Sequence, residues 1–211
     1  MLEGEARFEF RVWNDRLDEV TDRLRSLSDP FEVRESTETY FVSAVTVDVN
    51  PKARADQLDI KVLVGVREGF EQWGVKLKAE FPLDSALVMT ELFLSLRLAP
   101  PRLERDAYTL SQLVAEVVPA HPDLAAVEVK KHRQMHTVLA CTAEVTDAAI
   151  ARQELVTVAV ESADLSALRD VCRILGLDAY DNVSYPRAIR GVLGGRFRRR
   201  LSERRDSSSG P

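Results

Sequence analysis

Residues 3–12, EGEARFEFRV, alternate between two kinds of side chain. The odd positions hold Glu3, Glu5, Arg7, Glu9 and Arg11, and the even positions hold Gly4, Ala6, Phe8, Phe10 and Val12. A β-strand sends successive side chains to opposite faces, so this stretch predicts a strand with one apolar face and one ionic face. The ionic face requires either bulk water or a charged partner.

The composition predicts one globular domain. The chain has 211 residues, of which 45% are hydrophobic and 30% charged, and its net charge is -5. We expect this domain to span residues 1–195, followed by an arginine-rich and then Ser/Gly-rich tail, 196–211, that is disordered. Because no apolar run is long enough to span a membrane and no signal-peptide pattern opens the chain, we expect a cytoplasmic protein without membrane contact.

Further segments alternate in the same way as residues 3–12. The strands expected from this pattern are 37–45, 57–65, 72–81, 89–99, 125–138, 139–146 and 153–162, which with the first make about eight. Turn signals such as Asn50-Pro51 separate them. Helical spacing predicts helices over 14–27 with Asn14 as N-cap, over 111–118, over 165–177 with Asp164 as N-cap, and from Pro186 onward. This order predicts an α+β fold with an antiparallel, closed or nearly closed eight-stranded barrel.

The ionic face recurs on most of these strands. A solvated face explains one such strand, but if the helices cover the apolar outside of a closed barrel, the charged faces must point into its lumen. Crowded cations in a partly dry cavity repel one another, so a polyanion is the expected ligand. The lumen would gather Arg7, Arg11, Lys61, Lys76, Lys78, Arg97, Lys131 and Arg133.

Several of these segments resemble the CYTH superfamily, also called triphosphate tunnel metalloenzymes. Glu3-Gly4-Glu5-Ala6-Arg7 is similar to the Glu-x-Glu-x-Lys signature of that family, and TETYF at 37–41 to its Thr-x-Tyr-Phe strand. GVKLKAEF at 74–81, Lys131-His132-Arg133, and ELVTVAVES followed by a helix and SYPRAI at 184–189 resemble its later strands and last helix. The resemblance implies a tunnel barrel with a polar lumen, and the relatives it points to are thiamine triphosphatases, inorganic triphosphatases and class IV adenylate cyclases.

The resemblance also implies roles for particular residues. Glu3, Glu5 and Glu161 are the expected ligands of Mg²⁺ or Mn²⁺, with Glu9 as a substitute. The general base is left open, with Glu9 and Asp147 as its candidates. The eight basic residues of the lumen are the expected phosphate ligands. Two departures concern the metal: Thr157 and Ala159 stand in phase with Glu161 where the family shows glutamates, and Arg7-Phe8-Glu9-Phe10-Arg11 offers a second register for the signature.

Three functions follow from these observations. The first is divalent-metal-dependent hydrolysis of a triphosphate or polyphosphate, which we expect before cyclase activity. The second is a module that binds a polyphosphate, nucleotide or phosphorylated partner without catalysis. The third is a scaffold whose charged faces pair internally and whose arginine-rich tail makes contacts. A nucleic-acid partner is not expected, and a homodimer stays open.

Overall fold

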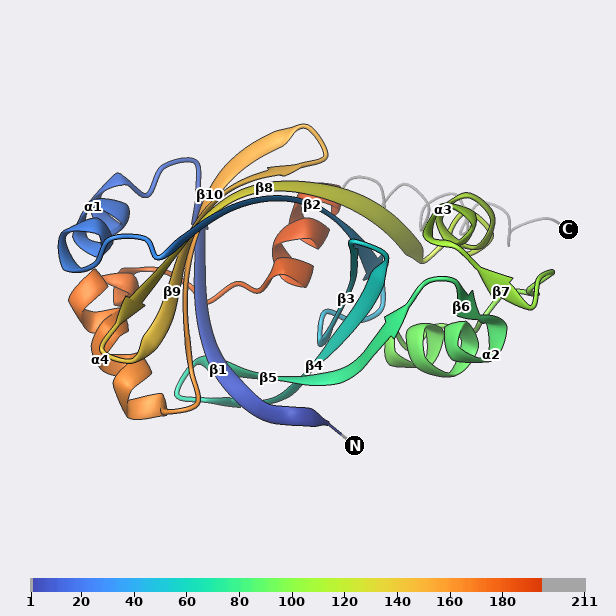
Figure 1. The fold of residues 1–211 in the computed structure, drawn as a ribbon, viewed down its shortest axis with the longest axis horizontal. Helices are drawn as coiled ribbons and strands as arrows, with labels where there is room; N and C mark the ends of the chain where they lie inside the picture. Colours follow the sequence, from blue (N-terminus) through green and yellow to red (C-terminus); the bar gives the residue numbers. More distant parts are fainter. Residues whose placement is uncertain (1, 195–211) are drawn as a thin grey trace, which may run out of the picture.

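A closed antiparallel barrel is the centre of the fold. The computed structural model describes residues 2–194, and in these residues eight strands close into a ring in the order β1-β10-β9-β8-β2-β3-β4-β5 (Figure 1). This confirms the predicted α+β barrel fold. The strands are β1 (Glu3–Asn14), β2 (Glu32–Ser43), β3 (Val49–Arg54), β4 (Gln57–Arg67), β5 (Phe70–Glu80), β8 (Leu124–Val138), β9 (Cys141–Ile150) and β10 (Gln153–Ser162). The predicted tail, 196–211, lies outside the described residues.

Two helices cover the outside of β1, β10 and β9, on the left of Figure 1: α1 (Asp18–Leu27) and α4 (Leu165–Leu175). Phe8 and Val12 lie on the apolar face of β1 and pack in one core with Leu24 of α1 and Leu168 of α4. The predicted cap of α4 is confirmed, because the Asp164 carboxylate accepts hydrogen bonds from the first backbone N–H groups of the helix. On this side of the barrel the apolar outer faces are therefore buried under helices, and the charged residues Glu9 and Arg11 of β1 point inward.

The first helix begins later than predicted. α1 starts at Asp18, and the residue at its N-cap is Leu17, which makes no side-chain capping bond. Asn14 is instead the last residue of β1 and accepts a hydrogen bond from the Asp15 N–H at 2.8 Å. The prediction of Asn14 as an N-cap is wrong because the strand continues through it.

A second cover lies over the outside of β2, β3 and β4. It consists of α2 (Ser85–Leu87), the helical segment η1 (Val88–Phe93), α3 (Leu110–Gln112) and η2 (Leu113–Val117), with a small sheet of β6 (Leu83–Asp84) and β7 (Ala107–Tyr108). The prediction of a strand over 89–99 is wrong. Val88, Leu92 and Leu96 are buried at a spacing of four residues, which is a helical face rather than a strand alternation.

One strand was missed, so the predicted count of eight is right although one of its members is wrong. The pair Asn50-Pro51, a turn signal in the sequence, belongs to β3. Pro51 pairs with Ile60 of β4, whereas β2 pairs only with Lys52 and Ala53. A proline is tolerated here because its missing N–H is not needed on the side where pairing with β2 stops.

The C-terminal helix closes one end of the barrel. Residues 185–194 are helical, and this red helix lies within the outline of the ring in Figure 1. Tyr185 and Ile189 pack against inward-facing apolar residues of the strands, including Tyr40, Val129 and Ile150. The inner faces of these strands are thus charged toward one end and apolar toward the other. Across residues 2–194 no helix has the length and apolar character needed to cross a membrane.

Candidate functional site

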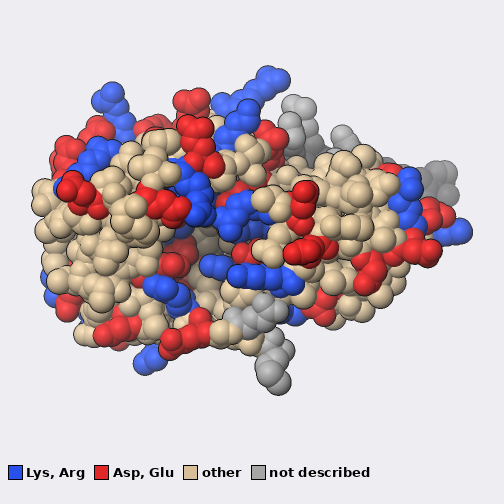
Figure 2. Space-filling model, in the orientation of Figure 1, with Lys and Arg blue, Asp and Glu red and all other residues tan. Residues whose placement is uncertain are grey.

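The lumen contains a cavity of about 330 Å³ lined largely by charged side chains. In Figure 2 blue Lys and Arg atoms gather around the hollow at the centre of the visible face, over the barrel. Four carboxylates also line it, namely Glu9, Asp59, Glu144 and Glu161. The seven lining cations are Arg11, Lys52, Arg54, Lys61, Lys78, Lys131 and Arg133.

Glu38 of β2 is a fully buried carboxylate in the lumen wall. Its Oε2 accepts hydrogen bonds from Lys131 Nζ at 2.8 Å and from the Tyr40 hydroxyl at 2.9 Å. Lys131 Nζ also donates to the Tyr40 oxygen at 2.6 Å. β2 and β8 are antiparallel neighbours, which brings residues 93 positions apart in the chain into contact.

Three more cations surround the same carboxylate. Arg133 Nη2 lies 3.2 Å and Arg54 Nη1 lies 3.6 Å from Oε1, and Lys52 Nζ lies 3.4 Å from Oε2. Burial raises the pKa of Glu38, but Lys52 and Lys131 outweigh it and hold that pKa far below its ordinary value, so the carboxylate stays ionised. We call this group the Glu38 cluster: Glu38, Tyr40, Lys52, Arg54, Lys131 and Arg133.

Burial acts in the opposite sense on the lysines of the cluster. It lowers the pKa of Lys131, and the charge of Lys52 lowers it further. The pKa of Lys52 is lowered mainly by burial as well. An additional anion close to these two lysines would stabilise their charged forms.

Arg11 of β1 links a second set of carboxylates. Its Nε donates to Glu9 Oε1 and its Nη1 to Glu144 Oε1, both at 2.8 Å. Burial raises the pKa of Glu144, but Arg11 and Arg133 lower it to about 2. The guanidinium of Arg11 also lies 4.6 Å from the ring centroid of Tyr185, which joins the ion network to the helix that closes the barrel.

Lys61 and Lys78 differ from the other lining cations. Within the described part of the chain, neither has a carboxylate oxygen within 4.0 Å, and both lie on the wall of β4 and β5. Among residues 2–194, two buried acceptor atoms nearby, Asn50 Oδ1 and Asp59 Oδ1, have no hydrogen-bond partner, and neither does the hydroxyl oxygen of Tyr185 at the apolar end. An anion could satisfy the two lysines, whereas the Asn50 and Asp59 oxygens are acceptors and require a donor group.

Arg7 and Glu5, which were also predicted for the site on the first strand, are more exposed than Glu9 and Arg11. Arg7 is half exposed and lies beside Glu161, with Nε 3.9 Å from Oε1. Glu5 is exposed, and the side chain of Glu3 lies outside the described part of the structure. The pairing of β1 with β5 shifts between Glu3 and Arg7, where Gly4 has a φ of 81°, so strict alternation does not extend through this stretch.

Three predicted site residues do not lie in the lumen. A bulge between Ile60 and Lys61 shifts the pairing of β4 with β5, and Lys76 points outward, where its Nζ donates to Ser95 and pairs with Glu91. Arg97 follows the helical segment η1 and pairs with Asp48. The expectation that Lys76 and Arg97 share the inner face is therefore wrong.

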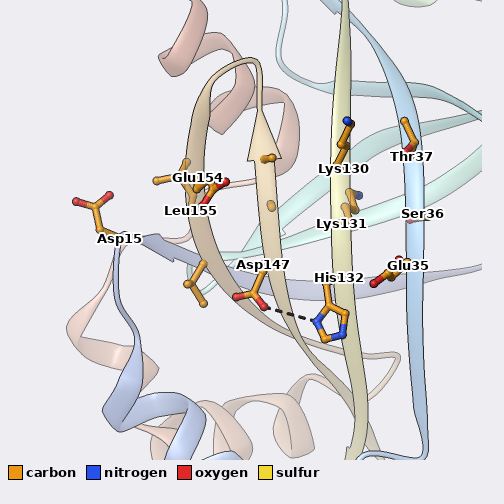
Figure 3. Close-up of a pocket in the computed structure, with 13 residues that line it drawn as sticks. Asp15, Glu35, Ser36, Thr37, Lys130, Lys131, His132, Asp147, Glu154 and Leu155 are labelled. Carbon is orange, nitrogen blue, oxygen red and sulfur yellow. Dashed lines mark ion pairs between the residues drawn. The ribbon is translucent and has the colours of Figure 1, made fainter.

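Asp147 is the third of these residues. It lies on the outer face of β9, where its Oδ2 is 3.6 Å from Nδ1 of His132 (Figure 3). The two residues line an external groove of about 700 Å³ along β2, β8, β9 and β10, together with Glu35 and Glu154. Asp147 is thus separated from the lumen by the sheet.

Sequence reasoning missed much of the ion network. One signal for Glu38 was available in TETYF, where Glu38 and Tyr40 lie on the same face of the strand. A carboxylate that faces the same lumen as the lysines of other strands is expected to form ion pairs with them. Glu144 stood in phase with Thr142 and Thr146 on β9. Lys52 and Arg54 were not predicted as lumen residues because β3 was not predicted. Tyr185 lies in the lumen only because the C-terminal helix closes the barrel, which its local sequence does not indicate.

The lumen carboxylates do not form a metal-binding group in the described structure. Glu71, Glu9 and Glu161 stand in one row on the neighbouring strands β5, β1 and β10. Each already has a cationic partner: Glu71 contacts Arg187, Glu9 contacts Arg11 and Glu161 lies beside Arg7. Among residues 2–194 no three His, Cys, Asp or Glu side chains are arranged to hold a metal ion.

Comparison with known proteins finds likeness only in structure. No family model and no curated protein matches the sequence. A conserved hypothetical protein from Pyrococcus furiosus is 16% identical, with 87% of this chain and 98% of that chain covered and a TM-score of 0.44. HpAC1 from Hippeastrum, described as having a dominant triphosphatase activity, is 10% identical over 89% and 96% of the two chains, with a TM-score of 0.46.

A third solved structure is the RNA triphosphatase Pct1 of S. pombe in complex with the Spt5 CTD. It is 11% identical, with 94% of this chain and 82% of that chain covered and a TM-score of 0.32. At these identities and TM-scores the likeness carries no functional argument.

Proposed function

We propose that the barrel lumen binds the phosphate chain of a triphosphate or polyphosphate. The observation that carries this proposal is the surplus of positive charge in the lining, above all Lys61 and Lys78, which have no carboxylate within 4.0 Å in the described residues. Unpaired cations in a partly enclosed cavity raise the free energy of the empty protein. A multivalent anion removes this cost and accepts hydrogen bonds from each of them.

The lining also offers suitable donor geometry. Arg54 and Arg133 present planar guanidinium groups for phosphate oxygens, and the lysines supply ammonium groups with three donors each. Burial raises the pKa of the Tyr185 hydroxyl, so this group remains a protonated donor at the closed end of the lumen. The carboxylates that face the same cavity orient these donors and keep the number of free charges small.

Metal-dependent hydrolysis is the second function we propose to test. The row of Glu71, Glu9 and Glu161 favours it, because three carboxylates on neighbouring strands border the basic lumen. In this structure the three are held by arginine and do not fit a divalent cation. We therefore derive no catalytic step through Mg²⁺ or Mn²⁺, and anion binding is the function that the geometry supports best.

The lysines of β5 provide a matched test of binding. We expect tripolyphosphate to raise the melting temperature of the protein, and Lys78→Ala to weaken its binding by about tenfold, the effect of one lost charged contact. Lys76→Ala, two residues away on the outer face, should bind as the wild type does. Isothermal titration calorimetry measures both. No stabilisation at millimolar tripolyphosphate, or an equal loss in the two variants, would refute the proposal.

Phosphate release decides between the two functions. The assay uses tripolyphosphate with Mg²⁺, with Mn²⁺ and without metal, on the wild type and on Glu9→Gln. Metal-dependent release that is lost in Glu9→Gln would establish hydrolysis. Binding without release under all three conditions would establish a non-catalytic anion-binding module.

A further inference from the structure

The lumen has a mouth at one end, toward which its inward side chains become more exposed. Along β1 the exposed fraction of the side chain rises from 7% at Arg11 to 18% at Glu9 and 44% at Arg7. Along β3 it rises from 15% at Lys52 to 41% at Arg54. Because each strand of the ring is antiparallel to its neighbours, both series rise toward the same end of the barrel, where β1 begins and β3 ends.

The other end of the lumen is filled by the C-terminal helix, residues 185–194. Tyr185, Ile189 and Leu193 pack in one core with inward side chains of β2, β8 and β9, namely Tyr40, Val42, Val127, Val129, Ala148 and Ile150. Ile189, Val129 and Ile150 have no solvent-exposed surface. A passage wide enough for water would expose the side chains along it, so no such passage runs beside these strands.

The segment before this helix holds it in place. The backbone N–H of Val183 donates to the Arg11 carbonyl oxygen, and its carbonyl oxygen accepts a hydrogen bond from Trp13 Nε1, both at 2.8 Å. Arg187 Nη2 lies 3.3 Å from Glu71 Oε1 of β5. The helix is thus bonded to β1 and β5 and packed on β2, β8 and β9, as the floor of the lumen.

We propose that the lumen binds a phosphate chain only by its end. This inference rests on the proposed anion-binding function and narrows its ligand. A terminal phosphoryl group is attached through one bridging oxygen, so it can approach the floor while the rest of the chain leaves through the mouth. An interior group is attached on both sides, so both parts of the chain would have to leave through the same mouth, where their charges repel.

A terminal phosphoryl group also suits the charge of the lumen. It presents three non-bridging oxygens and carries up to two negative charges at neutral pH, whereas an interior group presents two oxygens and one charge. The seven lining cations outnumber the four lining carboxylates and Glu38 together, so positive charge remains for such a group. The end of the chain therefore gains more from the lumen than its interior does.

Three ligands with the same three phosphates test this by isothermal titration calorimetry on the full chain in metal-free buffer. Tripolyphosphate has two free ends, adenosine triphosphate has one and diadenosine triphosphate has none. We expect adenosine triphosphate to bind within about threefold of tripolyphosphate, because one free end is enough. Diadenosine triphosphate should bind about tenfold or more weakly than adenosine triphosphate, because its phosphates reach only the cations at the mouth.

The series contains its own control for charge. Each adenosine removes about one negative charge from the ligand, so a purely electrostatic effect would weaken binding by a similar factor at both steps. Binding by the end requires a small first step and a large second step. Two similar steps, or equal binding of adenosine triphosphate and diadenosine triphosphate, would overturn the inference.

Lys52 and Arg54 provide a matched pair of positions at two depths. They lie two residues apart on β3, and both contact Glu38. Lys52→Met should weaken the binding of adenosine triphosphate about tenfold and leave that of diadenosine triphosphate within about twofold, whereas Arg54→Met should weaken both. If Lys52→Met weakens both ligands by the same factor, a ligand without a free end reaches the deep cations and the inference fails.

The outcomes separate this inference from the function on which it rests. If tripolyphosphate does not bind the wild type, the proposed function fails and this inference fails with it. If tripolyphosphate binds and diadenosine triphosphate binds as tightly as adenosine triphosphate, the function stands and binding by the end is refuted. The wild-type series decides this even where a variant does not fold.

Discussion

The cations on two sides of the lumen differ in their carboxylate partners. On β2, β3 and β8, four cations share the buried carboxylate of Glu38, whereas on β4 and β5 the side chains of Lys61 and Lys78 have no carboxylate within 4.0 Å in the described residues. The first wall is an internal salt-bridge network of the kind that a scaffold would use. On the second wall the carboxylate of Asp59 lies between Lys52 and Lys78 in the sheet, but it forms no ion pair with either lysine of that wall within 4.0 Å among the described residues. The same alternating sequence pattern therefore gives cations that share a buried carboxylate on one side of the barrel, and lysines without an ion pair among the described residues on the other.

The largest expected effect comes from removing the carboxylate of the paired wall. Glu38→Leu leaves four cations facing one another without their shared counter-ion. We expect the free energy of unfolding to fall by about 3–5 kcal/mol, as for other buried ion pairs that lose one partner. Urea denaturation in phosphate-free buffer measures this loss.

The matched control for that substitution is Glu128→Leu on the outer face of β8. Its carboxylate is exposed and lies 3.9 Å from Lys130, so we expect a change within about 0.5 kcal/mol. Similar losses in the two variants would show that the paired wall is not held together by its charges.

The second largest effect is expected at low pH, where protonation of Glu144 should weaken its ion pairs with Arg11 and Arg133. The pKa of Glu144 is lowered from 4.5 to about 2, mainly by Arg11 and Arg133 against the opposing effect of burial. A carboxylate with a lowered pKa stabilises the fold above its unfolded pKa, and this stabilisation is lost as the pH falls toward the folded value. We therefore expect the free energy of unfolding to fall between pH about 4.5 and about 2, with Glu144 contributing about 3 kcal/mol.

Glu144→Gln provides the comparison for this pH dependence. The variant cannot lose an ionised carboxylate at that position, so its free energy of unfolding should fall less steeply over the same pH range. Urea denaturation at several pH values measures both slopes. Equal slopes in variant and wild type would assign the acid sensitivity to other groups.

Local patterns in the sequence were enough for the barrel and for the direction of its charged faces. The alternation within residues 3–12 and 153–162 predicts β1 and β10, because a strand with one buried face specifies its own orientation. The pattern was misleading over 89–99, where leucines satisfy both a period of two and a spacing of four. The helix is favoured only because Val88 and Leu92 pack against the outer face of the barrel, which the local sequence does not show.

The pairing of charges could not be predicted in the same way. Lys76 and Lys78 are equivalent in a regular strand, and a single bulge between β4 and β5 places one outside and one inside. Glu38 meets Lys131 only because β2 pairs with β8 in one register. Such contacts depend on neighbours distant in the chain, so the sequence predicts a basic lumen but not which of its cations remain free.

The smallest expected effect is on the unpaired wall. Lys61 has no carboxylate within 4.0 Å among residues 2–194, and its charge is one of the influences that lower the pKa of Lys52. Lys61→Met removes this repulsion and keeps the apolar length of the side chain. In phosphate-free buffer we expect the free energy of unfolding to stay constant or to rise by up to about 0.5 kcal/mol, as measured by urea denaturation.

The matched variant on the paired wall is Lys131→Met, which makes the same substitution at a cation that donates hydrogen bonds to Glu38 and Tyr40. It should lose about 1–3 kcal/mol, because both acceptors are buried and lose a charged donor. Tripolyphosphate should reverse the comparison: it should stabilise the Lys131 variant more than the Lys61 variant, since only the latter has lost a free cation. If Lys61→Met destabilises the protein as much as Lys131→Met in the absence of phosphate, Lys61 has a structural partner and the two walls are equivalent.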